Sequence, residues 1–267
     1  MCRAEGDHSL ILYKYLRPRR LDVLHRQFIR FTPPRILNDP FEMKPYYVGE
    51  ETWEHLREWL IGRASELSGS ESESYRQDLR RADHARLQAE LDTYVNRTFG
   101  IFCLSEKRDD LLMWSHYADG HRGFVLGFDC THRFFNWLGL SPSEIWRVAK
   151  VSYENNRPRV TLSTLKDARL LYMTKSTTWA YEQEWRFMSL LENADLKKSD
   201  GDEHPVDLFR YPAECLREVV FGCRAAPELV VELSQALRSN AALAHVACYQ
   251  ARERADTFAV HVNRHDI

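Results

Sequence analysis

The sequence lacks the features that mark several common classes of protein. Its six cysteines contain no C-x-x-C pair, and four of them lie in apolar runs such as "GIFCLS" and "VVFGC". This pattern is typical of reduced, buried thiols rather than of a disulfide framework or a zinc site. No apolar run is long enough to span a membrane, and the N-terminal "MCRAEGDHSL" lacks the layout of a signal peptide. We therefore expect a cytoplasmic protein without a membrane partner.

The charge balance and the missing motifs exclude further classes. Lys and Arg total 37 against 39 Asp and Glu, so general nucleic-acid binding is not expected. The sequence contains no glycine-rich nucleotide loop, no G-x-S-x-G nucleophile motif and no H-E-x-x-H zinc motif. His116 and His121 do not share a helical face, and His261 and His265 fall in a predicted strand and at the terminus, so we predict no metal site. The basic "RPRR" at 17–20 is interpreted as solvated surface.

The hydrophobic pattern predicts a single α+β domain over residues 1–267. The chain is 44% hydrophobic and 28% charged, a balance typical of a globular protein with a sizeable core. Apolar residues at steps of three and four predict helices at 51–67 and 75–96, which form a helical insertion over 50–97. Pro227 at a helix start and a closing Ser-Asn predict a further helix at 227–240. Asp109 is the predicted N-cap of a short helix in "DDLLMWSHYA". Runs rich in aromatic and β-branched residues predict strands, among them "ILYKYL", "QFIRFT", "EWRFMSLL", "LREVVFGC" and a hairpin of "AHVACYQA" with "TFAVHV". Because strands and helices interleave irregularly, we expect a mixed, mainly antiparallel central sheet with flanking helices.

Three segments resemble the bacterial family called domain of unknown function 2971. They are "LYKY" at 12–15 with "NDPFE" at 38–42, "CLSEKRDDLLMWSHYADGHRGFVLGFD" at 103–129, and "YMTKSTTWAYEQEWRF" at 172–187. A weaker similarity lies in "LREVVFGCRA" at 216–225. The resemblance implies a shared fold and a shared site, but no particular reaction.

The segment "TKSTTWAYEQEWRF" at 174–187 supplies the first candidate site. If residues 181–190 form a strand, Glu182, Glu184 and Arg186 share one face, with the two carboxylates about 6 to 7 Å apart. Such a pair can stabilise positive charge at a sugar C1 and bind a ribose hydroxyl, as the E-x-E of arginine-type ADP-ribosyltransferases does. As a helix capped by Thr177 or Thr178, the same segment would instead form a structural Glu182–Arg186 pair.

The segment "MWSHYADGHRG" supplies the second candidate site. Trp114 is interpreted as a packing residue at helical spacing. His116 and Tyr117 lie near the end of the short helix, where an imidazole and a stacking surface would line a cleft.

The segment "ILNDPFE" has turn chemistry that accounts for it without a function, because Asn38 or Asp39 can bond local backbone and Pro40 fixes φ. The alternative is that Asn38, Asp39 and Glu42 edge a pocket beside "LYKY". We expect the segments 12–42, 105–121 and 174–187 to meet around one pocket.

The resulting hypothesis is an enzyme with an ADP-ribosyltransferase-like fold that uses NAD or a related nucleotide as substrate in glycosyl transfer. Glu184 would stabilise the oxocarbenium-like transition state, Glu182 would orient the acceptor or a ribose hydroxyl, and His116 completes the predicted catalytic set. The predicted substrate-binding residues are Tyr13, Lys14, Tyr15, Asn38, Tyr117, Lys175 and Arg186. Such a reaction suits a toxin or antiphage effector whose acceptor macromolecule the sequence does not name. The alternatives are a non-catalytic nucleotide-sensing or protein-interaction module, and a nuclease, which would need a metal-binding carboxylate cluster.

Overall fold

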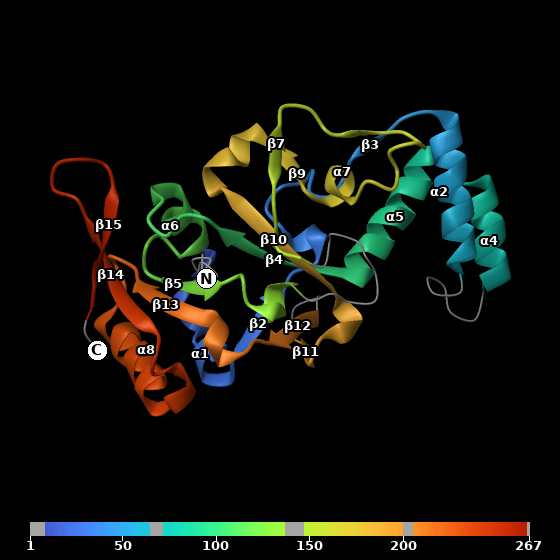
Figure 1. The fold of residues 1–267 in the computed structure, drawn as a ribbon. Helices are drawn as coiled ribbons and strands as arrows, with labels where there is room; N and C mark the ends of the chain where they lie inside the picture. Colours follow the sequence, from blue (N-terminus) through green and yellow to red (C-terminus); the bar gives the residue numbers. More distant parts are fainter. Residues whose placement is uncertain (1–8, 65–71, 137–146, 200–204, 266–267) are drawn as a thin grey trace, which may run out of the picture.

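A computed structural model describes residues 9–64, 72–136, 147–199 and 205–265 of the chain. It confirms the predicted α+β class, since a mainly antiparallel central sheet carries helices on its faces (Figure 1). In spatial order the sheet contains β15 (Val260–Arg264), β14 (Ala247–Glu253), β13 (Leu216–Phe221), β5 (Phe124–Asp129), β1 (Ile11–Leu16), β4 (Phe99–Ser105), β10 (Glu184–Leu190) and β6 (Ala149–Lys150). Only the β13–β14 pair is parallel among the pairs described in this sheet, and β14 with β15 forms the predicted hairpin.

Smaller strands and helices surround this sheet. Three small sheets consist of β11 (Leu196–Ser199), β12 (Pro205–Arg210) and β2 (Phe28–Phe31); of β3 (Tyr46–Tyr47) and β8 (Arg159–Val160); and of β7 (Ser152–Glu154) and β9 (Thr174–Ser176). The α-helices are α1 (Asp22–Arg26), α2 (Glu50–Gly62), α4 (Ser72–Arg81), α5 (His84–Thr98), α6 (Leu111–Tyr117), α7 (Ala168–Tyr172) and α8 (Pro227–Ser239). Short 3-10 helices include η1 (Pro18–Arg20), η2 (Pro34–Ile36) and η6 (Thr177–Glu182). No helix in the described ranges is long and apolar enough to cross a membrane.

Side-chain alternation along β1 divides the core between the two faces of the central sheet. Leu12 and Leu16 join the large apolar cluster that also contains residues of α1, α8 and the β2–β12 strands. Tyr15 faces the other side, where its ring meets Trp114 of α6 edge to face at 5.3 Å. Because side chains alternate along a strand, the sequence of β1 determines which of its side chains pack on each face of the central sheet. Lys14 lies on the same face as Leu12 and Leu16, and its ammonium is placed over the Phe102 ring.

The described residues of the segment 50–97 include α2, α4 and α5, which extend to one side of the central sheet (Figure 1). These helices share an apolar cluster of their own, which includes Leu56, Leu60, Leu79, Leu87 and Leu91. The single helix predicted at 75–96 is wrong, because the chain breaks between α4 and α5. Asp83 causes the break by capping α5, its side chain accepting the N–H of Arg86 at 2.8 Å. Residues 65–67 of the first predicted helix lie outside the described residues.

The short helix after β4 begins one residue later than predicted. Asp110 is the N-cap of α6, and its Oδ1 accepts the N–H groups of Leu112 and Met113 at 3.0 Å. The predicted cap, Asp109, is therefore wrong. Asp110 is the better cap because its carboxylate reaches two of the unpaired N–H groups in the first turn.

Candidate functional site

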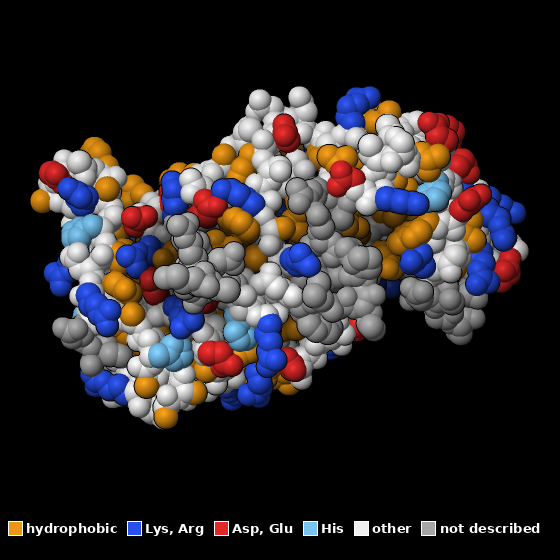
Figure 2. Space-filling model, viewed as in Figure 1, with side chains coloured by type: hydrophobic (Ala, Val, Ile, Leu, Met, Phe, Trp, Pro, Cys, Tyr) orange, Lys and Arg blue, Asp and Glu red, His pale blue; other side chains and the backbone are white. Residues whose placement is uncertain are grey.

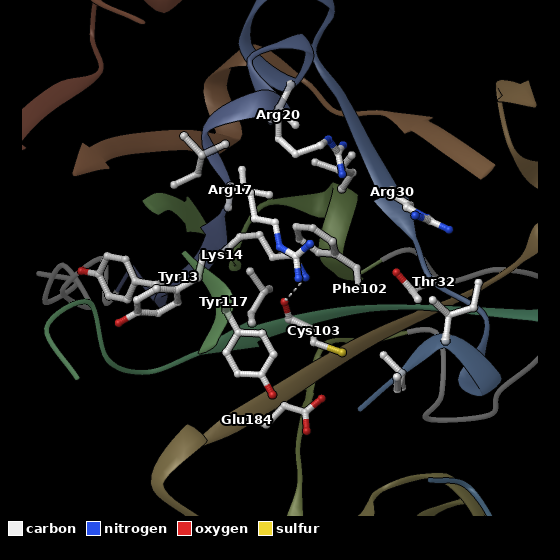
Figure 3. Close-up of a pocket in the computed structure, with 18 of the residues that line it drawn as sticks. Tyr13, Lys14, Arg17, Arg20, Arg30, Thr32, Phe102, Cys103, Tyr117 and Glu184 are labelled. Atoms are coloured by element: carbon white, nitrogen blue, oxygen red, sulfur yellow. Dashed lines mark hydrogen bonds between the residues drawn. The ribbon is translucent and has the colours of Figure 1, made fainter. Parts of the chain in front are cut away.

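A cavity of about 710 Å³ lies beside β1 and β4, and it is lined by side chains from distant parts of the chain. Lys14 and Phe102 come from the central sheet, Asn38 from the loop after η2, Tyr117 from α6 and Lys175 from β9. Figure 3 shows Arg20 and Arg30 at one end of this cavity and Tyr117 and Glu184 at the other. The segments 12–42, 105–121 and 174–187 thus contribute to one cavity.

The acidic end holds three buried carboxylates around two cations. Lys175 Nζ lies 2.7 Å from Glu182 Oε2, 3.2 Å from Glu184 Oε2 and 3.9 Å from Glu42 Oε2. Arg186 donates from Nε and Nη2 to the two oxygens of Glu184 at 3.0 Å. Its Nη2 also lies 2.7 Å from Glu42 Oε1, and its Nη1 donates to the carbonyl of Tyr172. Lys175 and Arg186 therefore join the three glutamates into one ion-pair cluster, which we call the glutamate cluster (Glu42, Lys175, Glu182, Glu184 and Arg186).

The backbone at Gln183 explains how Glu182 and Glu184 reach the same lysine. Glu182 is the last residue of η6, Glu184 is the first residue of β10, and Gln183 between them has a left-handed conformation with φ of 43°. This residue ends the 3-10 helix and turns the chain into the strand. Tyr153 fixes the turn further, because its hydroxyl accepts the Glu184 N–H at 2.8 Å.

Neither predicted conformation of 174–187 is correct in full. A continuous strand would have placed Glu182 and Glu184 on one face by alternation, but only Glu184 and Arg186 belong to β10. A helix would have paired Glu182 with Arg186, whereas the arginine pairs with Glu184 and Glu42. The residue that caps η6 is Ser176, whose hydroxyl accepts the N–H of Thr178, and not Thr177 or Thr178.

Burial and the neighbouring charges shift the pKa values within the glutamate cluster in opposite directions. Burial raises the pKa of Glu184, but Arg186 and Lys175 outweigh it and lower that pKa to about 2. The pKa of Glu42 is raised, because burial and the Glu184 charge outweigh the attraction of Arg186 and Lys175. Burial lowers the pKa of Lys175, but the three carboxylates outweigh it and raise that pKa. The cluster thus contains one carboxyl group that the neighbouring cations keep ionised and one that burial makes easier to protonate.

A chain of hydrogen bonds leads from the glutamate cluster along the cavity wall. The Tyr117 hydroxyl donates to Glu182 Oε1 at 2.5 Å and accepts from the Asn38 amide at 3.1 Å. Burial and the Glu182 charge raise the pKa of Tyr117, so it remains a hydrogen-bond donor. Asp39 behaves as the predicted turn residue, its Oδ1 accepting the N–H of Phe41 at 2.9 Å.

The opposite end of the cavity is basic. Six side chains contribute to it: Lys14, Arg17, Arg19, Arg20, Arg30 and Lys198. Arg20 is paired with Asp22 at 3.0 Å, but in the described part of the chain no carboxylate forms an ion pair with Lys14, Arg17, Arg19 or Lys198. Lys14 donates to the Cys103 carbonyl at 3.0 Å, and burial lowers its pKa. The run "RPRR", interpreted from the sequence as solvated surface, thus borders the cavity.

The structure brings most of the predicted site residues together, with differences of orientation. Lys14, Asn38, Tyr117, Lys175, Glu182 and Glu184 line the cavity, and Arg186 lies behind Glu184, fully buried. Tyr13 and Tyr15 also border it, but both pack on the α6 side of the sheet, where Tyr15 donates to the Lys107 carbonyl. His116 does not line the cavity. It is exposed, and its Nδ1 lies 3.0 Å from the Tyr181 hydroxyl. Trp114 is fully buried, in agreement with its packing interpretation.

The sequence did not identify two groups of lining residues as part of the site, namely Glu42 and the arginines of "RPRR". Glu42 was only an alternative pocket residue beside the turn at Asn38 and Asp39, and no local signal distinguishes it from an exposed glutamate. The arginines of "RPRR" had a usable signal, since they follow directly the strand that carries Lys14. In the described ranges, no group of three or more His, Cys, Asp or Glu residues is arranged to hold a metal ion.

Comparison with known protein families gives a match that includes parts of the second and third motif segments. Residues 113–187 match a family model described as "Protein of unknown function (DUF2971)". The match supports the resemblance to the DUF2971 family over this segment. It covers Tyr117, Lys175, Glu182, Glu184 and Arg186, which is most of the acidic end of the cavity. No curated protein and no solved structure matches the chain.

Proposed function

We propose that this protein is an enzyme that uses NAD or a related nucleotide in a glycosyl-transfer reaction. One observation carries the proposal, namely that the cavity has opposite charge at its two ends. Seven lysine and arginine side chains and four carboxylates line it, although the whole chain has a net charge of −2. On the face shown in Figure 2, basic and acidic side chains are interspersed. The basic excess is therefore a property of the cavity and not of the protein as a whole.

The basic end suits the phosphate groups of such a ligand. Arginine donates two parallel hydrogen bonds to a phosphate, and Arg17, Arg19 and Arg20 lie on one short segment at this end. Lys14 lies deeper, beside the Phe102 ring, and its single described hydrogen bond goes to a carbonyl group. Its remaining N–H groups can contact a phosphate oxygen in a partly buried setting, where charge attraction is stronger than in water.

The acidic end of the cavity suits the ribose and its C1–N bond to the base, which is the bond that breaks. The C1–N bond breaks with its electron pair going to the base nitrogen, which leaves positive charge on the ribose ring that a carboxylate stabilises. The acceptor then forms the new bond to C1 with a lone pair and loses its proton to a carboxylate or to water. Sequence reasoning gave the stabilising role to Glu184. The geometry favours Glu182, because the Glu184 charge is already held by two bonds from Arg186 and by Lys175.

The same ion pairing favours a second candidate, a non-catalytic module that binds a nucleotide. In this alternative the glutamate cluster is a structural lattice, and the basic end alone recognises the ligand. The two candidates differ in turnover but not in binding. Incubation of the purified protein with NAD, with nicotinamide release as the readout, separates them. Binding of ADP-ribose without release of nicotinamide would favour the module, and the absence of both would contradict each candidate. A role as toxin or phage-defence effector belongs to the first candidate alone.

Lys14→Met is expected to weaken the binding of ADP-ribose by about 10- to 100-fold, because a hydrogen bond to a charged group contributes about 1.5 to 3 kcal/mol. Stability should not fall, since the substitution removes a desolvated cation that has no carboxylate partner. Titration calorimetry and thermal unfolding measure the two effects. Lys197→Met is the matched control, because Lys197 is exposed, pairs with Asp207 and does not line the cavity. Equal affinities of the two variants would contradict the assignment of the basic end.

A further inference from the structure

We propose that Glu42 is the general acid of this site and that the substrate is a nucleotide whose base is uncharged while it is still bonded to the ribose. The inference rests on the proposed function and deepens it by naming the leaving group. Glu42 lines the cavity, its side chain is 2% exposed, and the glycosyl-transfer steps derived above do not use it.

The contacts of Glu42 leave it the least compensated carboxyl group of the glutamate cluster. Glu184 receives two hydrogen bonds from Arg186 and one from Lys175, and Glu182 receives one from Lys175 and one from Tyr117. Glu42 Oε1 lies 2.7 Å from Arg186 Nη2, and Glu42 Oε2 lies 3.9 Å from Lys175 Nζ. Neither of its buried oxygens accepts a well-aligned hydrogen bond within the described residues.

Charge balance also places a proton on Glu42. Three ionised glutamates facing Lys175 and Arg186 would leave one uncompensated negative charge in the buried cluster, which is unfavourable. Lys14 also attracts Glu184 and Glu182, but burial lowers its pKa and so disfavours its charged form. One proton makes the glutamate cluster neutral. Glu42 is the group that takes it, because burial raises its pKa while the pKa of Glu184 is lowered to about 2. The charged groups that act on Glu42 are Arg186 and Glu184 of β10 and Lys175 of β9.

Glu42 has access to both the substrate and the solvent. Glu42 also lines a second cavity of about 130 Å³, together with the exposed residues Arg35, Pro40 and Lys44. Glu42 lines both cavities. A proton that Glu42 gives to a ligand in the large cavity can therefore be replaced from the smaller one without passing through the ligand site.

A carboxylic acid at this position selects the kind of base that leaves. The nicotinamide of NAD is cationic and leaves as a neutral molecule without a proton. A neutral nucleobase instead leaves as a poor anion unless an acid protonates it, which is the step that general acids accelerate. In the proposed reaction the Glu42 proton goes to the base while the C1–N bond breaks, with the electron pair passing to the base nitrogen. Water adds to C1 and loses a proton to solvent, and Glu42 regains one proton through the smaller cavity, so that the products are a ribose phosphate and the free base.

The test compares two substrates, AMP and NAD, in wild type and in Glu42→Gln. We expect wild type to release adenine from AMP, and the variant to lose about 10²- to 10⁴-fold of this rate, the usual contribution of a general acid. The loss of nicotinamide release from NAD should be at least about tenfold smaller, because that leaving group needs no proton. Glu90→Gln is the matched control. It makes the same change at a buried glutamate that lines neither cavity, and it should affect both substrates equally.

Several results would overturn the inference. One is nicotinamide release without any adenine release in wild type, and another is an equal loss for both substrates in Glu42→Gln. Release of no base from any nucleotide by wild type would instead remove the proposed function itself, and the general-acid role with it.

The pH dependence of stability gives a second readout that needs no activity. A raised pKa in the folded state means that the folded chain binds the Glu42 proton more tightly than the unfolded chain. The stabilisation is complete below the unfolded pKa of 4.5 and is lost as pH rises through the folded pKa. Relative to Glu42→Gln, the unfolding midpoint of wild type should therefore fall as the pH rises above about 4.5 and through the raised pKa of Glu42. A midpoint difference that is constant, or that rises with pH, would show Glu42 to be charged in the folded protein and would overturn the proposal.

Discussion

Arg186→Met is expected to destabilise the protein by about 3 to 5 kcal/mol, which is the usual effect of removing one partner from a buried ion pair. The arginine is fully buried and holds Glu184 with two hydrogen bonds, while its Nη2 also lies 2.7 Å from Glu42. Methionine fills a similar volume but leaves Lys175 as the only cation of the glutamate cluster. The free energy of unfolding from urea or guanidinium titration measures the effect.

The pH dependence identifies the cause of this loss. Without the arginine, the remaining carboxylates have raised pKa values, so the destabilisation should shrink as the pH falls and they take up protons. Arg122→Met is the matched control, because Arg122 forms an exposed pair with Asp119, and its loss should leave the unfolding midpoint nearly unchanged. A destabilisation by Arg186→Met no larger than that of the control would mean that the glutamate cluster does not stabilise the fold.

The second large effect is expected from Glu182→Gln, which should reduce turnover by about 10²- to 10³-fold, a typical loss for one electrostatic contact to the transition state. Its stability should change little. The glutamine amide can donate to the Tyr117 oxygen, while its carbonyl oxygen still accepts from Lys175, so both partners of Glu182 keep a hydrogen bond. Base release from the nucleotide and the thermal midpoint are measured on the same preparations.

Glu184→Gln is the informative comparison, because it removes the same charge two residues away. Glu184 accepts from Arg186 and Lys175, so an amide group there would face N–H donors. This variant should lose stability together with turnover. If both variants lost stability to the same extent, or if Glu182→Gln retained wild-type turnover, the glutamate cluster would be structural and the binding-module candidate would stand.

The sequence predicts much of the fold because the core follows local periodicity. Strand alternation in "ILYKYL" and "EWRFMSLL" corresponds to β1 and β10, and the helical spacing at 227–240 corresponds to α8. The resemblance to a family whose model matches residues 113–187 had the same local basis, a run of consecutive residues. Errors arose where one side chain decides a boundary, as Asp83 does between α4 and α5 and Asp110 does before α6. Caps of this kind depend on single hydrogen bonds that a hydrophobic pattern does not encode.

The glutamate cluster was only partly predictable, for a different physical reason. Glu182, Glu184 and Lys175 are close in sequence, so their motif directs attention to them. Glu42 reaches Lys175 and Arg186 only through the tertiary fold, and neither its neighbours nor its spacing indicates burial. The left-handed conformation of Gln183, which turns Glu182 toward Lys175, is adopted by a residue that does not specially favour it. Interactions of this kind become visible only when the segments are packed together.

Glu42 is far in sequence from Lys175 and Arg186, and this separation affects the order in which the molecule folds. Lys175, Glu182 and Glu184 can meet early, because closing a short loop loses little entropy. Glu42 must cross from a distant segment, and contacts between distant segments form slowly. Until its loop docks, the two cations face only two carboxylates and the site is open to water. Docking of that loop then buries a third carboxyl group, which brings a proton with it under the charge balance inferred above. Closure of this cavity should therefore be a late folding event that takes up a proton, and it should become slower as the solution becomes more alkaline.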